Sequence, residues 1–179
     1  MTTLTVNGTE QTISADEQTD LATALRGAGY TGVKCGCDGG ECGASTVLID
    51  GSPAMACGTT VGEAADAEIE TIAALGSQDD LHPIQQAFVD HFAVQCGYCI
   101  PGMIMEAKAL LAEEPDPSER EVRAALDDHI CRCTGYQKPV EAILDAAGRL
   151  QGTAVADGGS VETDPTTDGG RVRGGDNDE

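Results

Sequence analysis

The sequence contains no tryptophan, and aromatic residues make up only 3% of its 179 residues. Basic residues are also scarce: 10 lysines and arginines face 31 aspartates and glutamates, which gives a formal net charge of −21. A chain this acidic repels nucleic acid and anionic membrane surfaces, so we expect neither as a partner. Hydrophobic residues still account for 40% of the chain, which is enough for the cores of one or two small domains.

Long hydrophobic runs are absent too. No apolar stretch approaches the roughly 18 residues that a membrane-spanning helix needs, so we expect no span. Residues 1–6, Met-Thr-Thr-Leu-Thr-Val, lack the basic and then apolar pattern of a secretory signal. In a reducing compartment, cysteines stay as thiols rather than forming disulfides. We therefore expect a cytoplasmic protein whose eight cysteines are free to act as ligands.

Only three of the basic residues are lysines, at Lys34, Lys108 and Lys138. The acidic residues run along the whole chain, which argues against a single acidic face that docks a basic partner. Acid enrichment with little lysine is typical of adaptation to a high-salt cytoplasm, where screening suppresses self-repulsion. The composition therefore indicates a halophilic protein.

Four of the cysteines form two closely spaced pairs, Cys96-x2-Cys99 and Cys131-x-Cys133. Two disulfides would conflict with a reducing compartment. Zinc accepts four thiolates, but its usual pairs are spaced C-x2-4-C, and the second pair here is C-x-C. Buried, inert cysteines seldom occur at paired spacing. The spacing therefore favours an iron–sulfur centre, with zinc as the alternative.

Each pair stands just ahead of a helical pattern. Pro101 suits a first helical turn, and strong helix formers follow it up to Leu111. After the second pair, apolar residues recur on one helical face between Val140 and Leu150. The positive ends of two helix dipoles would favour an anionic, thiolate-ligated cluster between them.

A second group of cysteines lies in a glycine-rich loop near the N-terminus. A plant-type ferredoxin loop reads C-x4-C-x2-C with a distal fourth cysteine, and Cys37, Cys42 and Cys57 fit three of these positions. Ser45 stands at the third position in place of cysteine, while an additional thiol, Cys35, precedes the loop. The glycines let backbone N–H groups approach the sulfur atoms of a cluster.

The pattern around these loops predicts an α+β protein. Asn7-Gly8 and Asp50-Gly51 each mark the turn of a hairpin, and Ser14 or Asp16 is expected to cap a short helix between the two hairpins. Hairpin, helix, hairpin and closing strand suit a β-grasp, ferredoxin-like domain over residues 1–76. Residues 77–152 read as a four-helix bundle, with Phe92 on an inward face. An acidic, glycine-rich tail over 153–179 is expected to be disordered.

The cysteine motifs also carry a resemblance. Gln95-Cys96-Gly97-Tyr98-Cys99-Ile100-Pro101-Gly102-Met103, followed by residues 131–136 (Cys-Arg-Cys-Thr-Gly-Tyr), resembles the second [2Fe–2S] site of the xanthine dehydrogenase family. More narrowly, residues 2–152 resemble the small iron–sulfur subunits of molybdenum hydroxylases such as carbon monoxide dehydrogenase and aldehyde oxidoreductase. The resemblance implies two [2Fe–2S] clusters, with Cys96, Cys99, Cys131 and Cys133 as the ligands of the second.

The resemblance further implies a role in electron transfer. Electrons would pass from a molybdenum–pterin cofactor in a large subunit, through the two clusters, to an FAD-binding medium subunit or another acceptor. Gln95 would lie near the pterin. We expect no catalytic side chain in this chain, and His82, His91 and His129 read as surface or packing residues. Two alternatives stay open at this point: an autonomous soluble electron carrier, and a zinc-stabilised interaction module.

The family pattern has cysteine where this chain has Ser45, which leaves the first cluster with three matching thiols. Cys35 is expected to compensate, because C-x-C spacing supplies two ligands at Cys131 and Cys133. Ligation by the Ser45 hydroxyl and a weak or absent first cluster are the other possibilities. Of the three, the C-x-C spacing favours compensation by Cys35.

The charge of −21 predicts that salt stabilises the fold. The Debye length falls from about 10 Å at 0.1 M to about 3 Å at 1 M salt, which reduces repulsion among the carboxylates. We expect the thermal unfolding midpoint to rise between low and molar KCl. Equal midpoints in the two solutions would contradict adaptation to high salt.

Overall fold

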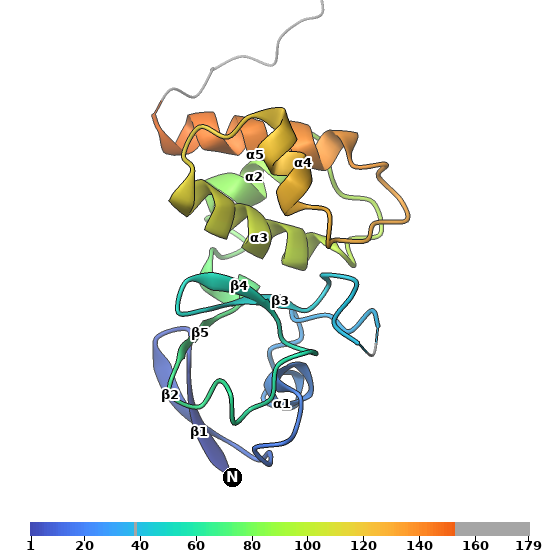
Figure 1. The fold of residues 1–179 in the computed structure, drawn as a ribbon. Helices are drawn as coiled ribbons and strands as arrows, with labels where there is room; N and C mark the ends of the chain where they lie inside the picture. Colours follow the sequence, from blue (N-terminus) through green and yellow to red (C-terminus); the bar gives the residue numbers. More distant parts are fainter. Residues whose placement is uncertain (38, 153–179) are drawn as a thin grey trace, which may run out of the picture.

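The computed structural model describes residues 1–37 and 39–152. A small sheet makes up one end of the molecule, and four α-helices are stacked at the other end (Figure 1). This mixed architecture confirms the expected combination of α and β structure. The predicted disordered tail over 153–179 lies outside the described residues.

The sheet contains five strands in the order β2-β1-β5-β3-β4. Their bounds are β1 (Thr2–Val6), β2 (Thr9–Ile13), β3 (Thr46–Ile49), β4 (Ser52–Met55) and β5 (Glu68–Glu70). β1 and β5 run parallel, whereas all the other neighbours are antiparallel. The central position of β5 therefore joins the two hairpins into one sheet.

Both hairpin turns form where the sequence predicts them. Asn7 and Gly8 have φ angles of 53° and 72°, and Asp50 and Gly51 have φ angles of 50° and 83°. Two successive positive φ values are the requirement of a type I′ turn, whose twist matches that of the flanking strands. The turn chemistry therefore sets the register of β1 with β2 and of β3 with β4.

The first helix, α1 (Leu21–Gly27), begins later than predicted. Its N-cap is Asp20, whose side chain accepts a hydrogen bond from the Thr23 N–H at 2.8 Å. The prediction that Ser14 or Asp16 caps this helix is wrong. Asp16 belongs to a separate turn, in which its carbonyl accepts from the Thr19 N–H at 3.0 Å. The cap selects the helix start because it satisfies an N–H group that the helix leaves unpaired.

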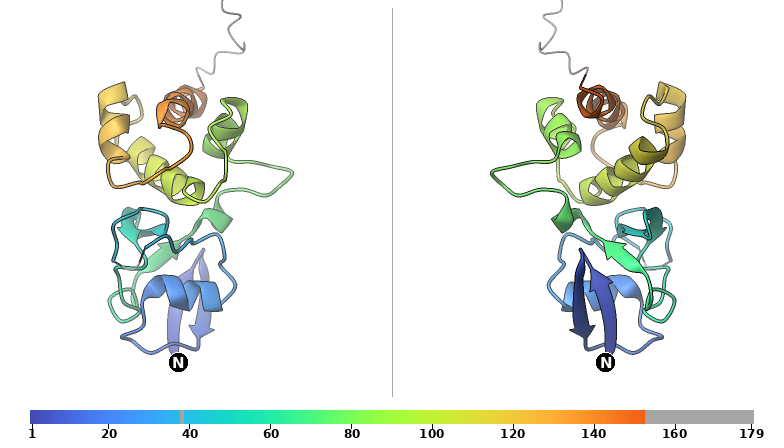
Figure 2. Two further views of the ribbon diagram at one scale, coloured as in Figure 1. Left: turned by 90° about the vertical axis from the view of Figure 1, so that its right-hand side faces the viewer. Right: turned by 90° about the vertical axis from the view of Figure 1, so that its left-hand side faces the viewer.

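The C-terminal half begins with a 3₁₀ turn, η1, and continues as four α-helices. Their bounds are η1 (Ile72–Ala74), α2 (Pro83–Asp90), α3 (Ile100–Glu113), α4 (Glu119–Ala125) and α5 (Gln137–Leu150). The connection between η1 and α2 projects from the side of the molecule (Figure 2), and the predicted domain boundary at residues 76 and 77 falls within it. Ser118 and Glu121 form the expected capping box at α4.

Phe92 is 84% exposed, so the prediction that it faces the bundle interior is wrong. Helix α2 ends at Asp90, two residues before Phe92. Phe92 itself has a φ of 52°, in the left-handed region that large side chains rarely adopt. The chain therefore leaves the helical path before Phe92, and its side chain no longer follows the inward face.

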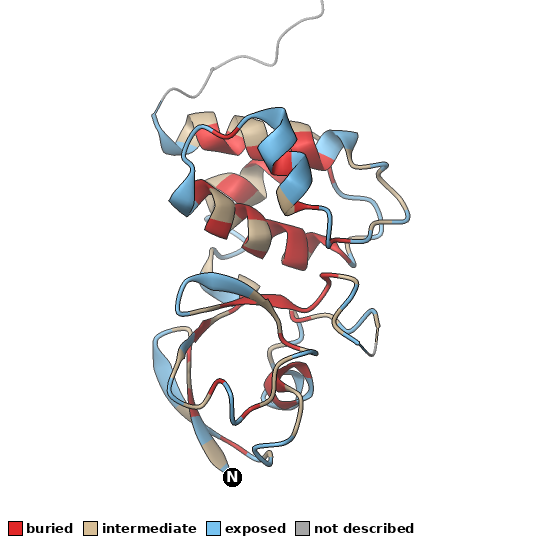
Figure 3. Cartoon of the chain, in the orientation of Figure 1, coloured by how far each residue is buried: buried red, intermediate tan, exposed pale blue. Residues whose placement is uncertain are grey.

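Each half has its own buried core, and a third cluster joins them. The sheet core includes Leu4, Leu21 and Ile69, and the helical core includes Phe88, Met103 and Ile143. Between the two halves, Leu48 of β3 packs against Met105 and Ala109 of α3. Helix α3 is thus buried on the side that faces the sheet as well as within the bundle (Figure 3).

Two glycines allow the halves to approach closely. A side chain at Gly102 of α3 would overlap the carbonyl oxygen of Gly43, and one at Gly43 would overlap the His129 ring. Gly43 also has a φ of 69°, which favours glycine. Nearby, Lys108 of α3 forms an ion pair with Glu70 of β5. At Gly43 and Gly102, the backbones of the two halves are therefore in direct contact.

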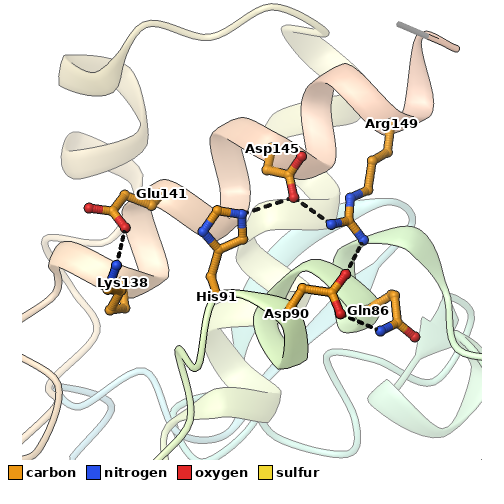
Figure 4. Close-up of polar contacts among 7 residues, drawn as sticks. All are labelled: Gln86, Asp90, His91, Lys138, Glu141, Asp145 and Arg149. Atoms are coloured by element: carbon orange, nitrogen blue, oxygen red, sulfur yellow. Dashed lines mark hydrogen bonds and ion pairs between the residues drawn. The ribbon is translucent and has the colours of Figure 1, made fainter. Parts of the chain in front are cut away.

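Charged side chains link α2 to α5 on the other side of the bundle (Figure 4). The Arg149 guanidinium contacts Asp90 at 2.7 Å and Asp145 at 2.6 Å. His91 contacts the same Asp145 oxygen at 2.9 Å. The hydrogen bond from Arg149 lowers the pKa of Asp90. Arg149 therefore offsets part of the acidic repulsion at the point where two helices pack.

Among the described residues, no helix combines the length and the apolar character needed to cross a membrane. The longest helices, α3 and α5, have 14 residues each.

The contact at Gly102 predicts a selective loss of stability. We expect Gly102→Ala to lower the free energy of unfolding by about 1–3 kcal/mol, because the new methyl group overlaps backbone that has little room to move. Gly27→Ala is the matched control: it lies in α1 with no atom near the position of its Cβ, so it should be neutral or stabilising. Denaturant unfolding measures both. Equal effects of the two substitutions would contradict the tight contact.

Candidate metal centres

The four cysteines of the second motif lie on two loops at one end of the bundle. Cys99 is the N-cap of α3 and is buried, whereas Cys96 is exposed. Cys131 and Cys133 are half-buried and precede α5. Side-chain hydrogen bonds pair the thiols of Cys96 with Cys133 and of Cys99 with Cys131. The fold thus brings together four sulfur donors from positions far apart in the chain.

The surroundings of these thiols shift their pKa values in different directions. Burial raises the pKa of Cys99 to about 12. Cys131 instead accepts hydrogen bonds from the Thr134 hydroxyl at 3.1 Å and from the Thr134 N–H at 3.4 Å. Burial opposes ionisation of Cys131, but hydrogen bonds, chiefly those of Thr134, prevail and lower its pKa. The Cys131 N–H also donates to the Tyr136 hydroxyl at 2.8 Å, which orients the loop.

The first group of donors lies on the loop between α1 and β3 and after β4. The thiols of Cys37 and Cys42 are hydrogen-bonded to each other. Ser45 is buried, and its hydroxyl donates to the sulfur of Cys57 at 3.1 Å. Cys35 is exposed, and its carbonyl accepts a hydrogen bond from the Tyr98 hydroxyl at 2.7 Å. The loop therefore holds two donor pairs and one additional thiol.

Backbone N–H groups favour the thiolate form at Cys37. The Glu41 N–H donates to the Cys37 sulfur at 3.4 Å. Together with the Gly39 N–H and the Cys42 thiol, it lowers the pKa of Cys37 to about 6. Burial raises the pKa of Cys42, which shares the hydrogen bond. At neutral pH one thiolate is therefore available in this pair, as a metal ligand requires.

The two groups of cysteines are neighbours. A cavity of about 200 Å³ is lined by residues from both loops, including Cys42 of the first group and Cys96, Cys99 and Cys131 of the second. The Ile130 N–H donates to the Cys42 carbonyl at 3.0 Å, one residue before Cys131. Sequence spacing gave no sign of this link, because it is made by backbone atoms of residues far apart in the chain.

His129 fills the space beside this link. It is only 2% exposed, and its Nε2 lies 3.2 Å from the Thr46 hydroxyl and 4.0 Å from Glu106. Burial lowers the pKa of His129 and raises that of Glu106 to about 7. The sequence predicts His129 to be a surface or packing residue. It gives no indication that His129 lies between the two halves.

Gln95 is exposed and directly precedes the exposed Cys96. Its backbone belongs to the loop between α2 and α3. The side chain is therefore accessible from outside at the edge of the second group of cysteines.

Two domain families match the chain. A 2Fe-2S iron-sulfur cluster binding domain matches residues 4–72, and a [2Fe-2S] binding domain matches residues 71–144. The first match covers the sheet and the first group of cysteines, and the second covers most of the helical half.

Individual proteins match over the same region. The chain is 44% identical to the nicotine 6-hydroxylase small subunit of Paenarthrobacter nicotinovorans, over 81% of this chain and 88% of that subunit. It is 46% identical to the aldehyde oxidoreductase of Megalodesulfovibrio gigas, over 90% of this chain but only 18% of the larger protein. The structure of quinoline 2-oxidoreductase from Pseudomonas putida 86 superimposes with a TM-score of 0.80 at 39% identity, covering 86% of this chain and 97% of the matched chain.

These matches cover 81–90% of this chain, and they also cover most of the nicotine 6-hydroxylase small subunit and of the matched quinoline 2-oxidoreductase chain. Together with the two groups of cysteines, they bear out the resemblance noted from the motifs. The chain belongs to the family of small [2Fe–2S] iron–sulfur subunits of the molybdenum hydroxylases.

Proposed function

We propose that this chain is the electron-transfer subunit of a molybdenum hydroxylase. It would relay electrons from a molybdenum–pterin centre in a large subunit, through two [2Fe–2S] clusters, to an FAD-binding medium subunit or another acceptor. The single observation that carries the proposal is the proximity of the two groups of cysteines: Cys42 of the first group lines one cavity with three cysteines of the second, and it accepts a hydrogen bond from Ile130. The thiolates would act as cluster ligands, and the clusters when bound supply one-electron redox chemistry.

The donor chemistry of the second group fits a [2Fe–2S] cluster. Each iron of such a cluster takes two ligands from the protein, and the four thiols already lie in two hydrogen-bonded pairs. We propose that Cys96 and Cys133 share one iron and that Cys99 and Cys131 share the other. The start of α3 at Cys99 points its positive end toward this anionic site.

For the first cluster we propose Cys37, Cys42 and Cys57 as ligands. Cys37 and Cys42 are hydrogen-bonded to each other, and Cys57 is paired with Ser45. Cys35 and Ser45 are the two candidates for the fourth ligand. The glycine-rich loop brings the Glu41 N–H to the Cys37 sulfur, a contact that stabilises negative charge on a ligand.

The fold supports a division into two cluster-binding domains. We propose that residues 1–76 form a β-grasp, ferredoxin-like domain, because two hairpins, one helix and a central closing strand make up the sheet half. We propose that residues 77–152 form a four-helix cluster-binding bundle. Each half has its own core, which supports this boundary.

The backbone offers a bonded connection between the clusters. Cys42 accepts the hydrogen bond from Ile130, and Ile130 is covalently joined to Cys131. Electron tunnelling is more efficient along covalent and hydrogen bonds than across a gap. The chain's own contribution to electron transfer is therefore to fix both sets of ligands in one continuous bonded structure.

The outer surface of the second cluster is the side that we propose faces the molybdenum partner. Cys96 and Gln95 are both exposed there, and Phe92 is 84% exposed a few residues earlier. We propose that Gln95 contacts the pterin and that the assembly works in the cytoplasm.

Purification from the native cell tests the proposed function. We expect the chain to co-purify with a large subunit containing molybdenum and with an FAD-containing subunit, and to hold about four iron atoms and four sulfides. Two distinguishable EPR signals are expected after reduction. A free single chain would indicate an autonomous carrier, and a colourless protein that contains zinc alone would refute the proposal.

Thr134 predicts a measurable effect on the second cluster. Its hydroxyl donates to the Cys131 sulfur, and such a hydrogen bond stabilises the more negative, reduced state. We expect Thr134→Val to make the reduction potential of this cluster more negative without loss of iron, as measured by EPR-monitored redox titration.

Two controls accompany this variant. Thr134→Ser keeps the hydroxyl and should keep the potential. Thr2→Val removes a hydroxyl that donates to the Ala15 carbonyl, far from the second cluster in the sheet half, and should leave the potential unchanged. An unaltered potential in Thr134→Val would show that this hydrogen bond does not tune the cluster.

A further inference from the structure

Ser45 occupies the position at which the first cluster lacks a cysteine. Its side chain is almost fully buried, at 1% exposed. Its hydroxyl donates to the Cys57 sulfur at 3.1 Å and accepts from the Cys57 N–H at 3.3 Å. Ser45 is therefore fixed against a ligand of the cluster from two directions.

The pairing of Ser45 with Cys57 repeats a pattern found at every other ligand position. Cys37 is paired with Cys42, Cys96 with Cys133 and Cys99 with Cys131. Each pair matches the two protein ligands that one iron of a [2Fe–2S] cluster takes. The Ser45 oxygen is thus located where the partner sulfur of Cys57 would otherwise lie.

Cys35 is less well placed to fill this position. It is exposed, and its carbonyl is tied to the Tyr98 hydroxyl at 2.7 Å. In the part of the chain that the structure describes, its thiol makes no hydrogen bond to Cys37, Cys42 or Cys57. The Cys35 thiol interacts with Cys37 and Cys57 only electrostatically, whereas the Ser45 hydroxyl is hydrogen-bonded to the Cys57 sulfur directly.

We propose that the Ser45 oxygen is the fourth protein ligand of the first [2Fe–2S] cluster and shares one iron with Cys57. This inference rests on the proposed function, because it presumes that the cluster is present. On coordination the serine O–H bond breaks, an Fe–O bond forms and the proton passes to solvent. The Cys57 N–H then remains as a donor to the negatively charged oxygen.

Oxygen ligation has a redox consequence. A serine alkoxide is a harder donor than a thiolate and stabilises ferric over ferrous iron. The first cluster should therefore be harder to reduce than the same cluster with four thiolates. Rieske centres show the opposite change: neutral imidazole ligands replace thiolates there, and the reduction potential rises.

Three variants of the full chain test the assignment. Ser45→Ala should lower the iron content from about four to about two atoms per chain and remove one EPR signal. Cys35→Ala, the matched control, should keep about four irons and both signals. Ser45→Cys should keep both signals and make the potential of the first cluster less negative in an EPR-monitored titration. This third variant retains a ligand, so it remains informative if Ser45→Ala is unstable.

Several results would overturn the assignment. These are loss of the first signal in Cys35→Ala, an unchanged first signal in Ser45→Ala, an unchanged potential in Ser45→Cys, and a wild-type chain that shows only the second signal. The second cluster serves as the internal reference. If its signal persists while the Ser45 assignment fails, the proposed electron-transfer function still stands; if both signals are missing from the wild-type chain, the function itself fails.

Discussion

The two halves of the molecule are held in position by the close approach of two backbone segments. Gly43 and Gly102 have no side chains, and this is what allows the first cysteine loop to lie against the start of α3. With that approach in place, the Ile130 N–H reaches the Cys42 carbonyl, and His129 fills the remaining space beside Thr46. A larger residue at either glycine would separate the two cysteine groups as well as the two cores.

The two groups of cysteines offer different surroundings to the same kind of cofactor. The first is a loop in which backbone N–H groups lower the pKa of Cys37, and it includes an oxygen donor beside Cys57. The second lies at the start of a helix, where burial raises the pKa of Cys99 and the Thr134 hydroxyl reaches Cys131. Hydrogen bonds, burial and ligand type are the terms that set cluster potentials, so the two centres are expected to differ. Electron transfer from one centre to the other is driven by such a difference in reduction potential.

Much of this arrangement is readable from the sequence because it depends on local chemistry. Asn7-Gly8 and Asp50-Gly51 specify their turns, and Ser118 and Glu121 specify a capping box. The predictions that were wrong concern features that depend on tertiary contacts and not on the local sequence. Helix α1 is capped by Asp20 and not by Asp16, because Asp16 belongs to another turn. Phe92 points outward because it follows the end of α2. The hydrogen bond from Ile130 to Cys42 could not be predicted, because backbone groups carry no residue-specific signal.

The hydrogen bond between Ile130 and Cys42 also has a consequence for biosynthesis. The segment that contains Cys42 leaves the ribosome long before Ile130 is translated, and domains generally fold N-terminal first. The sheet half can form its own core during this interval, while its cysteine loop still lacks the covering supplied by His129 and α3. The part of the loop at Gly43, which lies against His129 in the complete structure, is therefore uncovered until the helical half docks.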